Sequence, residues 1–249
     1  MRINLIIVQR DNGYIMDNHQ LLALALRTGA SLAGIANADI LRMSPSHRDT
    51  SRQTLPKATR SVLVLALHHP KKLPELDYWG GKGSTRGNLS LIRMAKDIAR
   101  QAKSDLDICA KPLEYQPTNK GTFLKDAAVL AGMGVIGKNN LLITPEYGPR
   151  VRLKALALEI ELPPTERRAD FDPCSSCAMP CRKICPQAAF ASDRYDRPKC
   201  AIQMQIDESA PLKSADANEY SVSYCRRCEL ACPVGQTETA GTKRSTGRH

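Results

Sequence analysis

The cysteine-rich C-terminal part of this chain constrains its fold more than any other feature. The 249 residues contain nine cysteines, and eight of them lie between positions 174 and 232. The upstream group is Cys174, Cys177, Cys181 and Cys185, followed by proline, and the downstream group is Cys200, Cys225, Cys228 and Cys232, again followed by proline. Disulfides among them would mostly close very small loops, in a chain longer than most disulfide-held scaffolds. We therefore expect metal-bound thiolates in a reducing compartment, the cytoplasm.

The spacing of these cysteines indicates two 4Fe–4S clusters. Ferredoxins with two clusters use C-x2-C-x2-C-x3-C-P, in which the fourth cysteine binds the other cluster. Here the upstream group reads C-x2-C-x3-C-x3-C-P, and the downstream group ends in C-x2-C-x3-C-P. By analogy, the first cysteine set (Cys174, Cys177, Cys181, Cys232) holds one cluster, and the second cysteine set (Cys185, Cys200, Cys225, Cys228) holds the other. Two zinc sites with four cysteines each are the alternative, but the repeated C-P ending favours iron and sulfur.

The residues before the cysteines predict alternating strands and helices. Hydrophobic residues make up 42% of the chain and aromatic residues only 4%, so aliphatic side chains must build the core. Periodicity predicts helices over 18–28, 89–103 and 123–134, strands over 31–38, 60–69 and 151–162, and a glycine-rich loop over 74–87. This pattern indicates an α/β domain.

Composition divides the chain into three parts. We expect an α/β domain over 1–163 that ends at Pro163-Pro164, a metal-dependent domain over 164–235, and a disordered polar tail over 236–249. Cys109 lies outside the pattern and is expected to be a small buried side chain. No apolar run approaches the roughly 20 residues of a membrane span. The net charge of +11 is compatible with nucleic acid, an acidic redox partner, a phosphate-bearing cofactor or simply a solvated basic surface.

Three segments resemble the superfamily of epoxyqueuosine reductases and reductive dehalogenases. They are ATRSVLVLALHHP (58–70), AGMGVIGKNNLLITPEYGPRVRLKALALEIELP (131–163) and YCRRCELACP (224–233). The resemblance implies an α+β sandwich, a nitroreductase-like cobalamin-binding domain, followed by a ferredoxin-like two-cluster domain. It also implies cobalamin as a cofactor, which receives electrons through both clusters from a low-potential donor such as ferredoxin or flavodoxin.

The resemblance also suggests residues that contact the corrinoid. Lys138 is the best candidate for a charged group that binds the corrinoid. It is also a candidate acid, because burial can lower the pKa of a lysine. Tyr78 is a second catalytic candidate, as a phenol in a cavity. Polar contacts to the cofactor are expected from Asn139, Asn140, Thr144, Tyr147 and Arg150. Simpler structural roles remain open for each: a surface lysine, a loop anchor, and a turn that leads into a strand.

Three functions remain open at this stage. Epoxyqueuosine reductases carry an acidic residue where this chain has Thr118 or Asn119, and many have a helical-repeat extension that is missing here. Lys138, in contrast, matches the lysine of the reductases and not the arginine of the dehalogenases. The leading hypothesis is an enzyme, a cobalamin-dependent iron–sulfur reductase of unknown substrate. The alternatives are an electron-transfer protein that reduces a partner such as a corrinoid protein, and an epoxyqueuosine reductase acting on tRNA.

Overall fold

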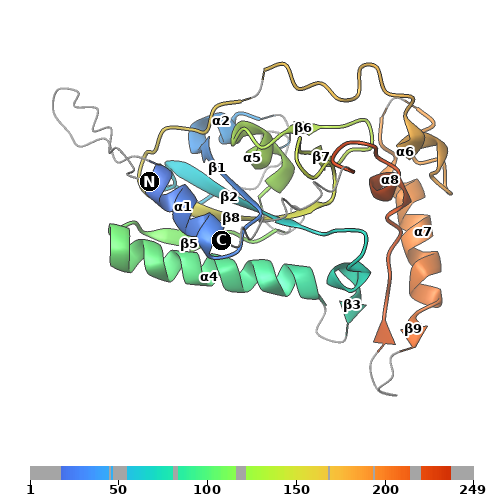
Figure 1. Cartoon of the computed structure of the whole chain (residues 1–249), viewed down its shortest axis with the longest axis horizontal. Helices are drawn as coiled ribbons and strands as arrows, with labels where there is room; N and C mark the ends of the chain where they lie inside the picture. The colour runs from blue at the N-terminus through green and yellow to red at the C-terminus, as the bar shows by residue number, and fades with distance from the viewer. Residues whose placement is uncertain are drawn as a thin grey trace, which may run out of the picture.

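A four-stranded antiparallel sheet forms the centre of the N-terminal part (Figure 1). The computed structural model describes residues 18–44, 46, 55–80, 84–115, 122–167, 169–192, 194–213 and 220–236. The sheet has the order β1-β2-β8-β5, in which β1 is Leu32–Asn37, β2 is Ser61–His68, β5 is Ala110–Pro112 and β8 is Val151–Leu158. Every neighbouring pair is antiparallel.

Helices cover both faces of this sheet, which explains why its central strands are apolar throughout. The side chains of β2 alternate: Val62 and Val64 face α2 (Ala38–Arg42) and α5 (Leu124–Leu130), while Leu63 and Leu65 face α1 (His19–Arg27) and α4 (Arg86–Leu106). The result is a three-layer arrangement with a core on each side of the sheet (Figure 1). This confirms the α/β class, with strands that run antiparallel.

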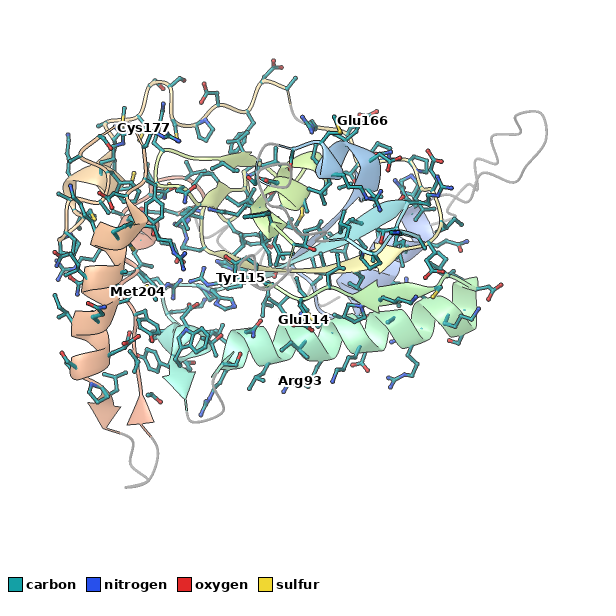
Figure 2. All side chains as sticks on the ribbon, turned by 180° about the vertical axis from the view of Figure 1, so that it is seen from behind. Arg93, Glu114, Tyr115, Glu166, Cys177 and Met204 are labelled. Atoms are coloured by element: carbon teal, nitrogen blue, oxygen red, sulfur yellow. The ribbon has the colours of Figure 1, made fainter. Side chains whose placement is uncertain are left out.

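A capping residue at one end and a left-handed residue at the other determine where the long helix α4 begins and ends. The Thr85 hydroxyl accepts a hydrogen bond from the backbone N–H of Asn88 at 3.1 Å and so caps the N-terminus. At the other end Asp107 adopts a left-handed conformation, with φ of 53°, and stops the helix. Arg93 lies on the outer side of the helix, away from the sheet (Figure 2).

The remaining elements are short and lie mostly at one end of the molecule (Figure 1). A 3-10 turn η1 (Pro74–Asp77) leads into the hairpin β3 (Trp79–Gly80) and β4 (Ser84–Thr85), and a second hairpin is formed by β6 (Val135–Ile136) and β7 (Leu142–Ile143). The cysteine-rich part contains α6 (Pro180–Lys183), α7 (Arg197–Ser209), β9 (Leu212–Lys213), β10 (Tyr220–Ser221) and α8 (Arg227–Leu230). Backbone bonds between Trp79 and Val222 join this part to β3.

Most expected elements of the N-terminal part are present, and two expectations need correction. The loop expected over 74–87 contains η1 and the β3–β4 hairpin. The expectation that Cys109 is buried is wrong, because this thiol is exposed just before the edge strand β5. Of the disordered tail expected over 236–249, only Gln236 is described, and its side chain donates to the carbonyl oxygens of Leu230 and Cys232. Residues 237–249, and also Thr118 and Asn119, lie outside the described residues. Within the described ranges, no helix combines the length and hydrophobicity that crossing a membrane requires.

Candidate metal centre

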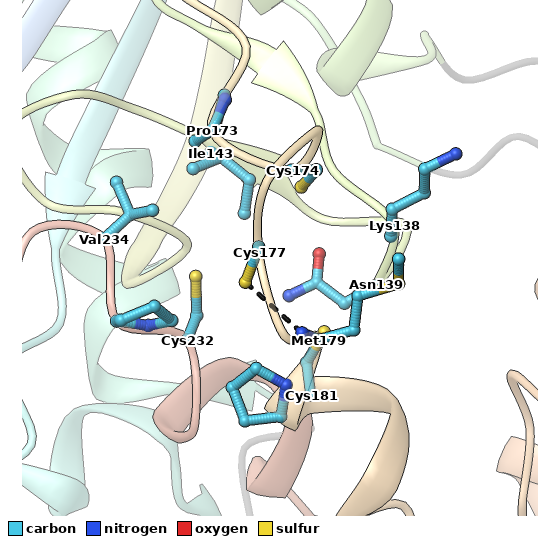
Figure 3. A pocket seen from close by; sticks show the side chains of 12 residues that line it. Lys138, Asn139, Ile143, Pro173, Cys174, Cys177, Met179, Cys181, Cys232 and Val234 are labelled. Atoms are coloured by element: carbon cyan, nitrogen blue, oxygen red, sulfur yellow. Dashed lines mark hydrogen bonds between the residues drawn. The ribbon is translucent and has the colours of Figure 1, made fainter.

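The four thiols of the first cysteine set surround one cavity (Figure 3). Cys174, Cys177, Cys181 and Cys232 come from two distant stretches of the chain, and Cys181 and Cys232 are buried. The rest of the wall is formed by Lys138, Asn139, Ile143, Pro173, Met179, Pro180, Pro233 and Val234. A cavity among four thiols is what a cubane requires, because each sulfur binds a different corner.

Local backbone geometry explains how the upstream cysteines reach this cavity. Met179 adopts a left-handed conformation, with φ of 53°, and turns the chain between Cys177 and α6. Pro180 then starts α6, where its missing N–H costs nothing, and Cys181 follows. The turn also directs the N–H of Met179 at the sulfur of Cys177, with a distance of 3.4 Å. Backbone N–H groups aimed at sulfur are a recognised means of tuning iron–sulfur clusters.

The second cysteine set gathers around α7 and α8. Cys200 lies on α7 and Cys228 on α8, while Cys185 follows α6 and Cys225 precedes α8. The N–H of Ala189 donates to the sulfur of Cys185 at 3.3 Å, which repeats the N–H to sulfur contact of the first set. All nine cysteines lie within the described residues, and each is a free thiol.

The other cysteines that raise the pKa of a buried thiol belong to the same set as that thiol. Burial raises the pKa of Cys228 to about 12, helped by the charges of Cys225, Glu229, Cys200 and Cys185. Burial also raises the pKa of Cys181, to which Cys232, Cys174 and Cys177 add. The pKa of each of these two thiols is thus raised further by members of its own set.

Such crowded thiols need a cation to become thiolates. Without one, burial and mutual repulsion favour the protonated form. Iron ions in a cluster would supply the compensating charge. Among the described residues, no three His, Cys, Asp or Glu side chains converge where a single metal ion would bind. The residues therefore fit two cubanes by their number, their spacing and, in the first set, the cavity that they line.

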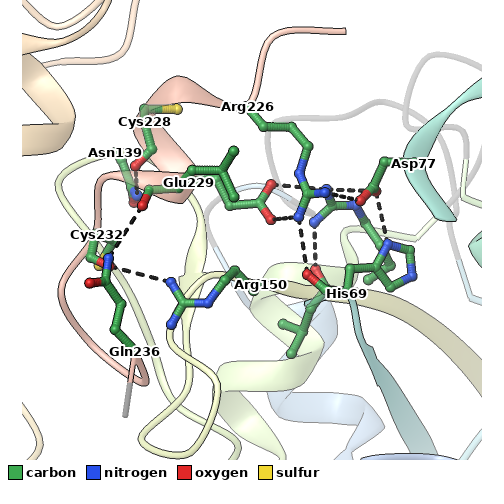
Figure 4. Close-up of polar contacts among 12 residues, drawn as sticks. His69, Asp77, Asn139, Arg150, Arg226, Cys228, Glu229, Cys232 and Gln236 are labelled. Atoms are coloured by element: carbon green, nitrogen blue, oxygen red, sulfur yellow. Dashed lines mark hydrogen bonds and ion pairs between the residues drawn. The ribbon is translucent and has the colours of Figure 1, made fainter. Parts of the chain in front are cut away.

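Arg150, directly before β8, ties the downstream group to the sheet (Figure 4). It is 5% exposed, and its guanidinium donates to the carbonyl oxygens of Cys232, at 3.3 Å, and Val234. Gly148 allows this approach, since a Cβ there would lie 2.0 Å from the Val234 oxygen. The side chain of Asn139 likewise donates to the Cys228 carbonyl at 3.4 Å. Both residues therefore hold the backbone that carries the cysteines.

A buried charged cluster forms a second attachment (Figure 4). The Asp77 carboxylate binds Arg226 and lies 2.8 Å from both Arg152 Nη2 and His69 Nδ1. Glu229 pairs with the same two arginines. Burial alone would raise the pKa of Asp77, but the hydrogen bond with His69 and the charges of Arg152 and Arg226 outweigh it and lower the pKa. Sequence reasoning missed this cluster, whose only signal is the charged pair inserted between the cysteines of YCRRCELACP.

The other predicted cofactor residues are scattered. Lys138 is exposed at the rim of the cavity that the first cysteine set lines. Tyr78 is half-buried between η1 and β3 and does not line this cavity. The Asn140 carbonyl accepts a bond from Lys125 Nζ at 2.6 Å. Tyr147 stacks on His68, with ring centroids 4.3 Å apart. Their roles toward a corrinoid stay predictions.

The buried polar groups in this region fit a corrinoid less well than the thiols fit the clusters. The Thr144 hydroxyl accepts from the N–H of Tyr147 at 3.1 Å and donates to the Gly148 carbonyl at 3.2 Å. Like Asn139 and Arg150, Thr144 is thus bonded within the protein. Of the predicted contacts, Lys138 is exposed beside the first set, and Asn140 and Tyr147 are partly accessible.

Curated relatives of this chain are named epoxyqueuosine reductases. The protein from Listeria monocytogenes is 28% identical over 191 residues, which cover 72% of this chain and 49% of the relative. The protein from Gloeobacter violaceus is 32% identical over 222 residues, covering 84% of this chain and 66% of the relative. The chain thus spans about half the length of the first relative. No family model matches the chain.

Solved structures of two kinds of enzyme share the fold. An epoxyqueuosine reductase with an epoxyqueuosine-modified tRNA stem loop superposes with a TM-score of 0.61 at 18% identity, covering 88% of this chain and 65% of that one. A reductive dehalogenase described by its B12-dependent dehalogenation gives 0.63 at 17% identity, covering 93% of this chain and 34% of that one. Both alignments extend over the sheet and the cysteine-rich part alike.

Proposed function

Because the chain is similar in sequence to epoxyqueuosine reductases and shares its fold with reductive dehalogenases, we propose that it is a reductase with two 4Fe–4S clusters and a cobalamin. The single observation that carries the proposal is the division of the eight cysteines into two spatial sets, one of which lines a cavity beside the N-terminal part. Two adjacent clusters provide a path for single electrons. A cobalamin, when bound, supplies low-valent cobalt chemistry.

The residues of this chain have separable tasks in the proposal. The first and second cysteine sets bind the clusters. Arg150 and Asn139 hold the backbone of Cys232 and Cys228 against the sheet. Lys138 places a positive charge at the rim of the first cavity, facing solvent, where a cofactor or substrate can approach. The proton donor, the low-potential electron donor and the cytoplasmic location stay predictions.

Epoxyqueuosine in tRNA is the substrate that we favour. The named relatives are epoxyqueuosine reductases, and one structural neighbour holds a tRNA stem loop carrying the modified base. The net charge of +11 suits a polyanionic substrate, because lysine and arginine contacts to phosphates release counterions. Binding to tRNA should therefore weaken steeply as salt is raised.

Anaerobic reconstitution with iron, sulfide and cobalamin tests the proposal. We expect about eight irons per chain from two cubanes, a corrinoid absorption spectrum after removal of free cobalamin, and turnover of tRNA carrying epoxyqueuosine with a chemical reductant. Cys174→Ser should lower the iron content and abolish turnover, whereas Cys109→Ser, which alters the exposed thiol outside both sets, should change neither.

The outcomes separate the remaining functions. Iron loading with corrinoid binding but no conversion of tRNA would contradict the substrate and leave a reductase of another substrate. Iron loading without corrinoid binding would favour an electron-transfer protein. Zinc instead of iron in oxygen-free preparations would overturn the whole proposal.

A further inference from the structure

The two cysteine sets differ in the sign of the charged side chains fixed beside them. Near the first set lies one buried cation, Arg150, while Lys138 at the cavity rim is exposed. Near the second set lie two carboxylates, Asp207 and Glu229. Arg227 also lies near the second set, and like Lys138 it is exposed. Water and salt screen an exposed charge much more than a buried one.

Arg150 is a fixed charge at the first set. Its guanidinium is held by the Cys232 and Val234 carbonyls, two atoms of the segment that carries a ligand of this set. Its positive charge opposes the burial that raises the pKa of the Cys232 thiol. An arginine keeps its proton even where burial lowers its pKa, as it does here. The cation therefore persists in every state of the site.

Asp207 is the corresponding fixed charge at the second set. One carboxylate oxygen accepts the N–H of Cys225 at 2.7 Å, and the other accepts from the Gln203 side chain at 2.8 Å. Glu229 is also close to Cys228, but Arg152 and Arg226 largely compensate its charge. Asp207 is thus the carboxylate that acts on the second set with the least compensation.

We propose that Arg150 and Asp207 create a difference in reduction potential between the two clusters, with the cluster of the first set easier to reduce. The inference rests on the proposed function, because it requires the clusters to be present. Reduction adds one negative charge to a cluster, so Arg150 stabilises the reduced form at the first set and Asp207 destabilises it at the second.

The consequence is a direction for electron flow. With both clusters bound, an electron from a low-potential one-electron carrier would pass by way of the second set to the first, and no bond would change and no proton would move. The first set borders Lys138 and the β6–β7 hairpin, so electrons would collect on the side where a substrate or cofactor can approach.

Redox titration of the reconstituted protein, followed by electron paramagnetic resonance, tests the inference. Cys174→Ser and Cys200→Ser, each of which alters one ligand of one set, assign the signals. We expect the first cluster to be reduced at the higher potential. Arg150→Gln should disfavour its reduction at least tenfold, which is 59 mV for one electron, while the second potential stays unchanged.

Three further variants test whether the charge of a side chain, and its place beside one cysteine set, determine the potential of that cluster. Arg150→Lys should keep most of the first potential because it keeps the charge. Asp207→Asn can still accept the Cys225 N–H, but it should raise the second potential alone. Arg93→Gln removes an exposed arginine of α4 and should shift neither.

Two results would overturn the inference: a first cluster that is harder to reduce than the second, or an Arg150→Gln variant that binds full iron and retains the wild-type potentials. If Arg150→Gln does not fold, the order of the wild-type potentials and the Asp207→Asn shift still decide. Wild-type protein that binds no iron would instead refute the proposed function.

Discussion

At the scale of single residues, Asp77 is the carboxylate on which the attachment of the cysteine-rich part depends most. It contacts Arg226 from that part and Arg152 and His69 from the sheet region. Removing one partner of a buried ion pair leaves uncompensated charge and costs about 3–5 kcal/mol. We expect Asp77→Asn to lower stability to urea by roughly that amount at pH 7. Asp97→Asn, which removes an exposed pair with Arg100, should cost less than about 1 kcal/mol.

The contribution of Asp77 to the stability of the folded protein should decrease as the pH is lowered into the acidic range. Its pKa in the folded protein lies below 3.8, the ordinary value for an aspartate. The stability that it provides is therefore fully present above that value and is lost as the pH falls through the lower, folded pKa. The difference in stability between wild type and Asp77→Asn should be constant from neutral pH to about pH 5 and shrink in stronger acid. A difference that shrinks on raising the pH would contradict this assignment.

At Gly87 we predict that replacement by alanine destabilises the protein, which is the opposite of its usual effect in a helix. Replacing glycine by alanine inside a helix normally stabilises it by about 1 kcal/mol. Here a Cβ would lie 2.1 Å from Cε1 of the buried His69. Overpacking of this kind costs about 1–3 kcal/mol, and it would displace the ring that contacts Asp77. We expect Gly87→Ala to lower the thermal midpoint, whereas Gly80→Ala, with no atom within 4 Å, should leave it nearly unchanged.

The sequence predicted the cysteine sets but not the residues that hold them. Cysteine spacing is local, so it can be read directly from the chain. The pairs Asp77–Arg226 and Arg150–Cys232 instead join positions far apart in the sequence, and nothing in the local pattern links them. Arg150 was predicted as a cofactor contact; the structure shows that it binds the backbone at Cys232 and Val234, a role that only tertiary contacts reveal.

At the scale of elements, hydrophobic periodicity succeeded where the sheet is buried on both faces. The strand expected over 60–69 matches β2 (Ser61–His68), and the helix expected over 18–28 matches α1 (His19–Arg27). The pattern failed for α7, which has no buried residue and exposes Ile202, Met204 and Ile206. A helix that buries none of its side chains carries no amphipathic signal.

The bounds of α4 provide the prediction at this scale. The helix begins three residues before the expected start at Leu89 because Thr85 caps it. Loss of an N-cap side chain costs about 1 kcal/mol. We expect Thr85→Ala to lower the free energy of unfolding by that amount, and Thr85→Ser, which keeps the hydroxyl, to retain most of it. Equal stabilities of Thr85→Ala and wild type in urea unfolding would show that the cap contributes nothing.

At the scale of the whole molecule, the two parts are stabilised by different means. The sheet region has two hydrophobic cores, one on each face. The described residues of α6, α7 and α8 contribute few buried side chains, among them Cys181 and Glu229. This part is attached to the sheet region by ion pairs, by Arg150 and by the backbone bonds between Trp79 and Val222. Metal binding must supply much of its remaining stability, because binding free energy at such sites is folding free energy.

Removal of iron should therefore loosen the two parts unequally. We expect anaerobic chelation to expose residues 174–232 to proteases while the sheet elements from β1 to β8 stay protected. The rate of cleavage, followed by mass spectrometry, should return to its initial value when iron and sulfide are restored. In Asp77→Asn the cysteine-rich part should be cleaved faster even with iron present, since one of its attachments to the sheet is lost. Simultaneous cleavage in both parts would show instead that the clusters stabilise the sheet region as well, so that the chain unfolds as a single cooperative unit.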